Sequence, residues 1–187
     1  MTYPPSELII NTDGSIFHLH LKPENLANKV ILVGDPGRVE TVASYFDSRE
    51  CDIQSREFHT ITGTYQGKRI SVISTGIGCD NCDIVINELD ALKNIDFCTR
   101  ENKDQVSSLE IVRIGTCGGL QPNTPIGTFI CTETSIGFDG IAAGTSLKGK
   151  TVKDVLVMLL GISILVNPVQ PKNAPFSILV TLAGITI

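Results

Sequence analysis

Two arginines of this 187-residue chain, Arg38 and Arg113, each stand beside a glycine-bearing turn that follows a short apolar run. Glycines let backbone N–H groups approach an oxyanion, a following helix offers its positive end, and guanidinium groups bind phosphate through paired, charge-assisted hydrogen bonds. These turns come after Val33 and Val112, and a third comes after Ser74. We expect an anion site where the three turns meet, although a glycine turn beside an arginine is also common as a plain connection.

Other phosphate-binding motifs are absent or incomplete in the sequence. No G-x-x-x-x-G-K-[ST] occurs, so nucleotide hydrolysis is poorly supported, and Gly76-x-Gly78-x-x-Asn81 lacks the third glycine of the dinucleotide fingerprint. Asp96 lies close to the spacing expected for a carboxylate that binds the ribose of NAD. An NAD-dependent oxidoreductase is therefore a distant alternative.

The elements that position these turns alternate between strands and helices. Periodicity and turn residues predict strands at 29–33, 57–65, 69–74, 109–112 and 127–134, with the second and third forming a hairpin. They predict helices at 38–46 and from an N-cap at Asp80 or Asn81, and an exposed loop at 96–108. The fold class is α/β, with a mixed, mostly parallel central sheet flanked by helices, in which ligands bind beyond the carboxyl ends of the strands.

The charge and the composition limit the classes of binding partner and the cellular compartment that we expect. The net charge of -5 and the pI near 5.1 argue against a broad basic surface for nucleic acid. The sequence starts without a basic segment and apolar run, and the apolar stretch at 155–166 is shorter than a membrane span, so we expect a cytoplasmic protein without a membrane partner. The six cysteines are expected to be free thiols, because disulfide frameworks are typical of small secreted chains without a core. Cys79-x-x-Cys82 has no second half to complete a zinc site.

Six motifs then occur in the order seen in one known family. The chain resembles nucleoside phosphorylases of the uridine phosphorylase type over residues 16–140, with the last clear match at 137–140. The length and composition predict a single domain over 1–187. Within it, 16–140 is the phosphorylase-like part and 141–187 is a divergent tail. The motifs are Phe17-His18-Leu19, Val33-Gly34-Asp35-Pro36-Gly37-Arg38-Val39, Ser55-Arg56-Glu57-Phe58, Ser74-Thr75-Gly76-Ile77-Gly78, Ile86-Asn87-Glu88-Leu89 and Arg113-Ile114-Gly115-Thr116-Cys117-Gly118.

The same resemblance assigns the phosphate site. It implies that Gly34, Arg38, Arg113 and Thr116 bind phosphate within one subunit, whereas Arg56 reaches in from a neighbouring subunit. Arg113 and Thr116 would be the catalytic residues. The sharing of Arg56 implies a homo-oligomer whose sites lie between subunits.

The nucleoside side of the site also follows from the resemblance alone. His18 would cross the subunit interface towards the ribose, Thr116 would touch both sugar and phosphate, and Gly118 would lie against the base. Glu57 would help to hold a monovalent cation such as K⁺ between subunits. Taken without the family, His18 is equally typical of a surface histidine and Glu57 of a solvated strand carboxylate.

The family reaction is the phosphate-dependent cleavage of the N-glycosidic bond of a nucleoside, uridine or another pyrimidine nucleoside here, giving free base and pentose 1-phosphate. It needs no cofactor, because inorganic phosphate is the co-substrate and no covalent enzyme nucleophile is required. The alternative is a degenerate phosphorylase-like protein that binds phosphate or nucleoside without turnover.

One part of the family pattern is missing. The family holds the ribose hydroxyls with a Glu-Met-Glu segment, but the methionines here are Met1 and Met158, neither of which is flanked by glutamate. Only Asp154 among the acidic residues lies beyond Ile141, and no arginine follows Arg113. We therefore expect an incomplete fold and a tail produced by a deletion, a frameshift or a gene-model artefact, which sequencing the transcript would test.

Overall fold

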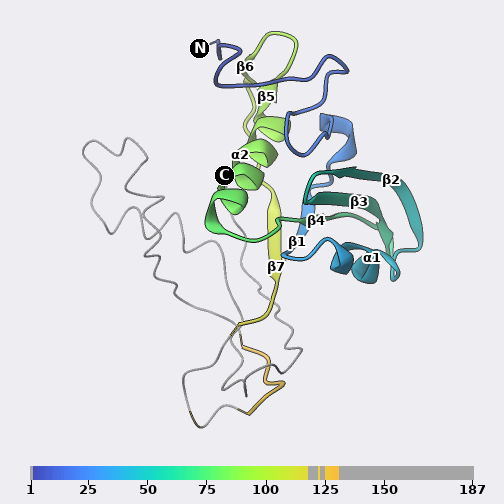
Figure 1. Ribbon diagram of the computed structural model, residues 1–187. Coiled ribbons are helices and arrows are strands. Elements are labelled where there is room, and N and C mark those ends of the chain that lie inside the picture. Colours follow the sequence, from blue (N-terminus) through green and yellow to red (C-terminus); the bar gives the residue numbers. More distant parts are fainter. Residues whose placement is uncertain (1, 118–121, 123–124, 131–187) are drawn as a thin grey trace. The chain divides into compact units, whose positions relative to one another are not determined.

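The computed structural model describes residues 2–117, 122 and 125–130 (Figure 1). A first compact unit extends to Glu110, and a second begins at Ile111. The described elements are a 3₁₀ turn at Pro23–Asn25, β1 (Lys29–Val33), α1 (Gly37–Ala43), β2 (Ser48–Ser55), β3 (Phe58–Tyr65), β4 (Lys68–Ser74), α2 (Cys79–Asn94), β5 (Ile95–Asp96), β6 (Glu101–Asn102) and β7 (Glu110–Ile114).

The central sheet has five strands in the order β2-β3-β4-β1-β7. β1 and β4 are parallel, with Lys29 opposite Ile70 and Val33 opposite Ser74. β2 with β3 and β3 with β4 are antiparallel. The α/β class with a mixed central sheet is confirmed, and the crossover between the parallel strands β1 and β4 contains α1 and the β2–β3 pair.

The hairpin predicted from the sequence is present as β3 and β4, whose Tyr65 and Lys68 face each other across a two-residue turn. The sequence analysis missed β2, the strand at the edge of the sheet. β2 is polar, and its residues are exposed or half-buried along its whole length. Charged residues are common on edge strands because they discourage pairing with another chain, but they also hide the apolar alternation that identifies a strand.

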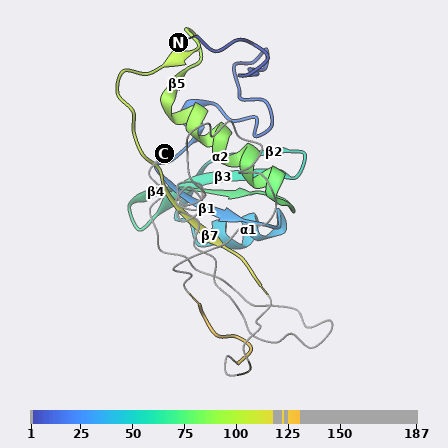
Figure 2. The ribbon, with the colours of Figure 1, turned by 90° about the vertical axis from the view of Figure 1, so that its left-hand side faces the viewer.

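The two helices lie on opposite sides of the sheet, as Figure 2 shows. α1 packs over β3 and β4, while α2 lies on the side of Phe58, whose ring is near His18 of the amino-terminal segment. This arrangement explains why the strands are apolar on both faces. The side chains buried at the centre include Val30, Leu32, Val33, Ile61, Val72, Ile73, Val85, Leu89 and Leu92.

Both predicted helices are present, with different ends. α1 stops at Ala43 rather than Phe46, because the amides of Tyr45 and Phe46 turn to i−3 carbonyls. The predicted N-cap of α2 at Asp80 or Asn81 was wrong: the helix begins at Cys79, and Gly78 is the N-cap with φ of 106°. Such a φ favours glycine, so the backbone conformation decides where α2 starts.

The strand predicted at 127–134 is not found over its described part. Residues 125–130 include a turn in which the amide and hydroxyl of Thr128 donate to the carbonyl of Pro125 (3.2 and 2.7 Å), and Gly127 has φ of 89°. Residues 131–134 lie outside the described part. The loop expected at 96–108 is mostly exposed, but β5 and β6 form a short antiparallel pair within it.

Three expectations stay predictions, namely the single domain, the phosphorylase-like span of 16–140 and the divergent tail at 141–187, because residues from 131 onward lie outside the described part. Among the described helices, none has the length and apolar character needed to cross a membrane.

Gly63 is the tightest point of the sheet. A Cβ atom there would lie 2.1 Å from the carbonyl oxygen of Ser48 and 2.7 Å from the Phe46 ring, beside the bulge in β2. We expect Gly63→Ala to lower the free energy of unfolding by about 3 kcal/mol, because backbone atoms cannot move aside cheaply.

The matched control is Gly67→Ala in the β3–β4 turn. Gly67 has φ of 73° and no atom within 4 Å of the added Cβ, so only the backbone conformation is penalised, by about 1 kcal/mol. Urea unfolding followed by circular dichroism measures both changes. Equal losses in the two variants would contradict the steric argument.

Candidate functional site

The parallel pairing of β1 with β4 places two of the predicted glycine turns at the same edge of the sheet. The amide of Thr75 donates to the carbonyl of Val33 at 2.8 Å, and the Thr75 hydroxyl donates to the same oxygen at 3.3 Å. The turn that starts at Gly34 and the loop that starts at Thr75 therefore leave the sheet side by side. This confirms the convergence expected for these two turns.

Gly34 and Arg38 belong to the first of these turns. Asp35 closes it, because its Oδ1 accepts a hydrogen bond from the amide of Gly37 (2.8 Å) and its carbonyl accepts one from the amide of Arg38 (3.0 Å). Arg38 lies in the first turn of α1 and is half-buried. The sequence thus fixes the Arg38 backbone beside the carboxyl end of β1.

Arg56 lies in the two-residue turn between β2 and β3, because Ser55 and Phe58 are paired partners. β3 runs antiparallel to β4, so this turn reaches the same edge of the sheet as Gly34. Arg56 has φ of 56°, a left-handed conformation that glycine usually supplies at such a turn. Its guanidinium carbon lies 5.6 Å from the centroid of the Phe17 ring, within the range of a cation–π interaction.

Glu57 joins the β2–β3 turn to the loop after β4. Its Oε1 accepts a hydrogen bond from Asn81 Nδ2 (3.0 Å), and its carbonyl accepts one from the Ser74 hydroxyl (2.7 Å). Gly76 packs against it so closely that a Cβ would lie 2.8 Å from Glu57 Cγ. The carboxylate is exposed, and its role in binding a monovalent cation stays a prediction.

The six arginines of the chain fall into two sets of three. In the first set each guanidinium is engaged by the protein: Arg49 by the Glu40 carboxylate (2.8 and 3.2 Å), Arg69 by Glu50 (2.7 Å) and Arg100 by the carbonyl of Tyr3 (2.9 Å).

Arg38, Arg56 and Arg113 form the second set. Within the part of the chain that the structure describes, no carboxylate or carbonyl accepts a hydrogen bond from any of these guanidinium groups. These are the three arginines that the sequence analysis assigned to phosphate. Cationic groups held without a protein counter-ion are what an anion site requires.

The remaining phosphate residues belong to the second unit. Arg113 is half-buried in β7, next to its last residue, and Thr116 is exposed two residues after that strand ends. Gly118 lies outside the described residues. The roles of Arg113, Thr116 and Gly118 stay predictions.

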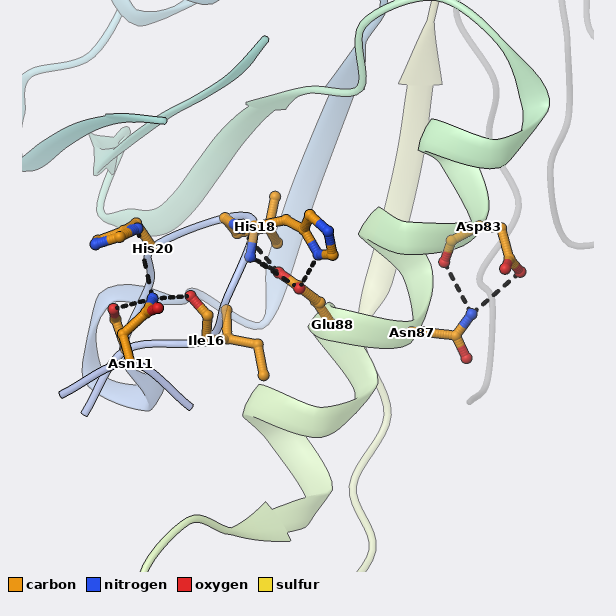
Figure 3. Close-up of polar contacts among 9 residues, drawn as sticks. Asn11, Ile16, His18, His20, Asp83, Asn87 and Glu88 are labelled. Carbon is orange, nitrogen blue, oxygen red and sulfur yellow. Dashed lines mark hydrogen bonds and ion pairs between the residues drawn. The ribbon is translucent and has the colours of Figure 1, made fainter. Parts of the chain in front are cut away.

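His18 is half-buried in the amino-terminal segment, and its ring is held by Glu88 of α2, with 2.6 Å between His18 Nδ1 and Glu88 Oε1 (Figure 3). Phe17 lies edge-on to the His18 ring with 4.7 Å between centroids, and it also lies under Arg56. The structure therefore groups His18 and Arg56, the two residues expected to reach a neighbouring subunit.

Sequence reasoning assigned no role to Glu88 or to Phe17. A signal for Glu88 was present, because it shares a helical face with the buried residues Val85, Leu89 and Leu92. A carboxylate within an apolar stripe needs hydrogen-bond donors, so its position predicts an internal partner.

Two further groups of polar residues have structural roles. Ligand atoms of Glu40, Asp52 and His59 lie within 4.8 Å of one another, a separation that a metal ion could bridge. However, Arg49 engages Glu40, and His59 Nε2 lies 2.7 Å from Asp52 Oδ1, so hydrogen bonds already account for this cluster. Asp96, the carboxylate considered for NAD, instead closes a turn by accepting hydrogen bonds from the amides of Cys98 and Thr99 (2.7 and 3.2 Å).

Comparison with known proteins identifies the family. The family model of the phosphorylase superfamily matches residues 28–177. The chain belongs to the phosphorylase superfamily. A uridine phosphorylase of Thermococcus kodakarensis is 34% identical over 128 residues, which are 68% of this chain and 41% of that protein. A DeoD-type purine nucleoside phosphorylase of a Thermoanaerobacter species is 33% identical over 119 residues, covering 63% of this chain and 46% of that protein.

A solved structure matches this chain in its fold as well as in its sequence. The crystal structure of a Trypanosoma brucei nucleoside phosphorylase, described as showing uridine phosphorylase activity, aligns with a TM-score of 0.70 and 36% identity over 77% of this chain and 49% of that one. The resemblance found in the sequence is confirmed. This phosphorylase superfamily chain spans less than half the length of the curated relatives it matches.

The left-handed conformation of Arg56 gives a test of the site backbone. In ordinary extended positions alanine is more stable than glycine by about 0.5–1 kcal/mol. At position 56 we expect the reverse order, with Arg56→Gly more stable than Arg56→Ala by about 1 kcal/mol, because alanine retains the strained φ and glycine does not. Both variants lose the contact with Phe17, so their difference isolates the backbone. Urea midpoints measure it, and the ordinary order would show that the turn relaxes.

Proposed function

We propose that this chain carries the phosphate half of a nucleoside phosphorylase site and acts in the phosphorolysis of a pyrimidine nucleoside, uridine first. The proposal is carried by three arginines, Arg38, Arg56 and Arg113, that have no protein counter-ion among the residues that the structure describes. The family of the chain, which includes uridine phosphorylases, supports it.

The proposed chemistry suits a site rich in arginine and glycine. Inorganic phosphate attacks the anomeric carbon as the base departs, through a transition state with oxocarbenium character. The arginines orient the phosphate, and its negative charge stabilises the developing cation, so positioning and electrostatics supply most of the rate. The Thr116 hydroxyl would contact both phosphate and sugar. Phosphate itself is the nucleophile, so the protein supplies no covalent nucleophile.

Uridine is proposed over a purine nucleoside on two grounds. Both types of phosphorylase match the chain, but the uridine phosphorylase of Thermococcus kodakarensis aligns over a larger share of it than the Thermoanaerobacter purine enzyme does. The Trypanosoma brucei protein is also described by its uridine phosphorylase activity. We further propose a homo-oligomer, since Arg56 and His18 are grouped around Phe17 and would be contributed together to a neighbour.

A second candidate is a phosphate- and nucleoside-binding protein without turnover. The specific observation in its favour is the missing Glu-Met-Glu segment, since the methionines of the chain are Met1 and Met158. Without carboxylates for the ribose hydroxyls, a sugar would be held less firmly for attack.

Phosphate-dependent release of free base from uridine, thymidine, adenosine and inosine separates these two candidates. We expect uracil release, with kcat/KM reduced about 100-fold in Arg38→Ala and Arg113→Ala because each removes a group that stabilises the phosphate. The matched control is Arg49→Ala, which removes an arginine already engaged by Glu40 and leaves turnover within about twofold.

Phosphate binding without base release from any nucleoside would favour the second candidate. Equal effects of Arg38→Ala and Arg49→Ala would contradict the assignment of the unpaired arginines to phosphate.

The proposed sharing of Arg56 between subunits is tested by mixing inactive variants. Arg38→Ala and Arg56→Ala are each expected to lose turnover. If Arg56 acts in a neighbour's site, unfolding and refolding them together builds mixed dimers with one intact site, and about a quarter of the wild-type activity returns. Refolding each variant alone is the control. No recovery in the mixture would show that Arg56 acts within its own subunit.

A further inference from the structure

Glu88 is a buried carboxylate on α2 whose hydrogen bonds, within the described residues, go to His18 and Leu19 (Figure 3). The residue is 9% exposed. Its Oε1 accepts a hydrogen bond from the His18 amide at 2.9 Å and lies 2.6 Å from His18 Nδ1, while its Oε2 accepts one from the Leu19 amide at 2.8 Å. One side chain therefore fixes both the backbone and the ring of His18.

These contacts define which nitrogen of the ring carries a proton. An ionised carboxylate has acceptors only, so a 2.6 Å contact with Nδ1 requires Nδ1 to be the donor. In a neutral imidazole the other nitrogen, Nε2, is then left with a lone pair. A ring held in this way has an acceptor at Nε2, which can take a hydrogen bond from a hydroxyl group.

The other neighbours of the ring restrict its tilt without competing for its nitrogens. Phe17 and Phe58 both lie edge-on to His18, with centroids 4.7 and 6.3 Å away. Asn11 also lies nearby, but its Nδ2 donates to the carbonyl of Ile16 at 3.0 Å and thereby stabilises the turn before His18. Asp13 strengthens that turn through the Ser15 hydroxyl, and this hydrogen bond lowers the pKa of Asp13.

We propose that Glu88 is a positioning residue: it holds His18 as the Nδ1–H tautomer, so that Nε2 accepts a hydrogen bond from a sugar hydroxyl of the nucleoside. The assignment of the ligand rests on the proposed function, whereas the assignment of the tautomer rests on the contacts of Glu88 alone.

The substitution Glu88→Gln tests the proposal sharply, because glutamine has nearly the same shape. With its carbonyl oxygen in the place of Oε2, glutamine can keep accepting the amides of Leu19 (2.8 Å) and His18 (3.2 Å). Its NH₂ group then stands in the place of Oε1 and must donate to Nδ1. The proton of the ring moves to Nε2, and the nitrogen that faced the ligand changes from an acceptor to a donor. Glu88→Gln therefore reverses the tautomer of His18.

Nitrogen-15 spectra of the full chain labelled at histidine report this reversal. The chain has three histidines, so His20 and His59 serve as internal references for folding. We expect wild-type His18 to be protonated at Nδ1 and the Glu88→Gln variant at Nε2, with the reference signals unchanged. The control Asp83→Asn removes a carboxylate from the same helix that contacts Asn87 rather than His18, and it should leave the His18 spectrum as in wild type.

A second experiment measures the binding of uridine to the same variants in the presence of inorganic phosphate. We expect Glu88→Gln to weaken uridine binding about tenfold, the loss of one hydrogen bond of about 1.4 kcal/mol, and to leave phosphate affinity unchanged. Wild-type affinity for uridine in Asp83→Asn would show that the effect belongs to Glu88. Equal weakening of phosphate and uridine would indicate general damage to the fold and overturn the positioning role.

Each remaining outcome decides one of the two claims. A wild-type His18 protonated at Nε2 overturns the proposal, and this holds even if Glu88→Gln does not fold. Normal uridine binding by a variant with the reversed tautomer also overturns it. If wild type shows the Nδ1–H tautomer but binds no nucleoside, the tautomer assignment stands and the proposed function fails.

Discussion

The parallel pairing of β1 with β4 is the constraint on which the candidate site depends. Parallel strands end at the same edge, so the chain after Val33 and the chain after Ser74 must turn in neighbouring positions. The β2–β3 turn reaches that edge as well, because β3 runs back along β4. A single register thus collects three loops that are up to about forty residues apart in the sequence, and Thr75 ties two of them together.

The arginines of the chain also differ in whether the protein provides them with a carboxylate partner. The pairing of Arg49 with Glu40 is exposed and contributes little stability, but it provides the Arg49 guanidinium with a carboxylate partner. The arginines near the sheet edge differ from Arg49, because no carboxylate of the described residues forms an ion pair with them. Unpaired arginines of this kind can bind a small anion even though the net charge of the chain is -5.

The sequence predicted the elements that have strong periodicity or clear turn residues. The β3–β4 hairpin followed from alternation and its turn residues, β1 from a short apolar run, and the buried face of α2 from helical spacing. β2 was missed because its edge position leaves polar side chains at nearly every residue. The start of α2 was misplaced because Gly78 sets it through its backbone, whereas Asp80 and Asn81 merely resemble caps.

The candidate site was predictable to a similar degree. Arg38 and Arg113 follow from the glycine turns, but Arg56 was found only through family resemblance, since no glycine turn in the sequence marks it out from the other arginines. The link between His18 and Glu88 could not be predicted, because seventy residues separate them and only the packing of α2 brings them together. Local sequence patterns identify turns and helices, whereas contacts between residues far apart in the sequence can be identified only from the fold.

The Phe17 ring has a consequence for how this protein can change over evolutionary time. It contacts both Arg56 and His18, and the His18 ring is held in turn by Glu88. These four side chains therefore form one network of contacts, in which a substitution at one position changes the surroundings of the others. Changes in substrate choice should therefore arise more readily at positions outside this group, where one substitution does not disturb three other side chains.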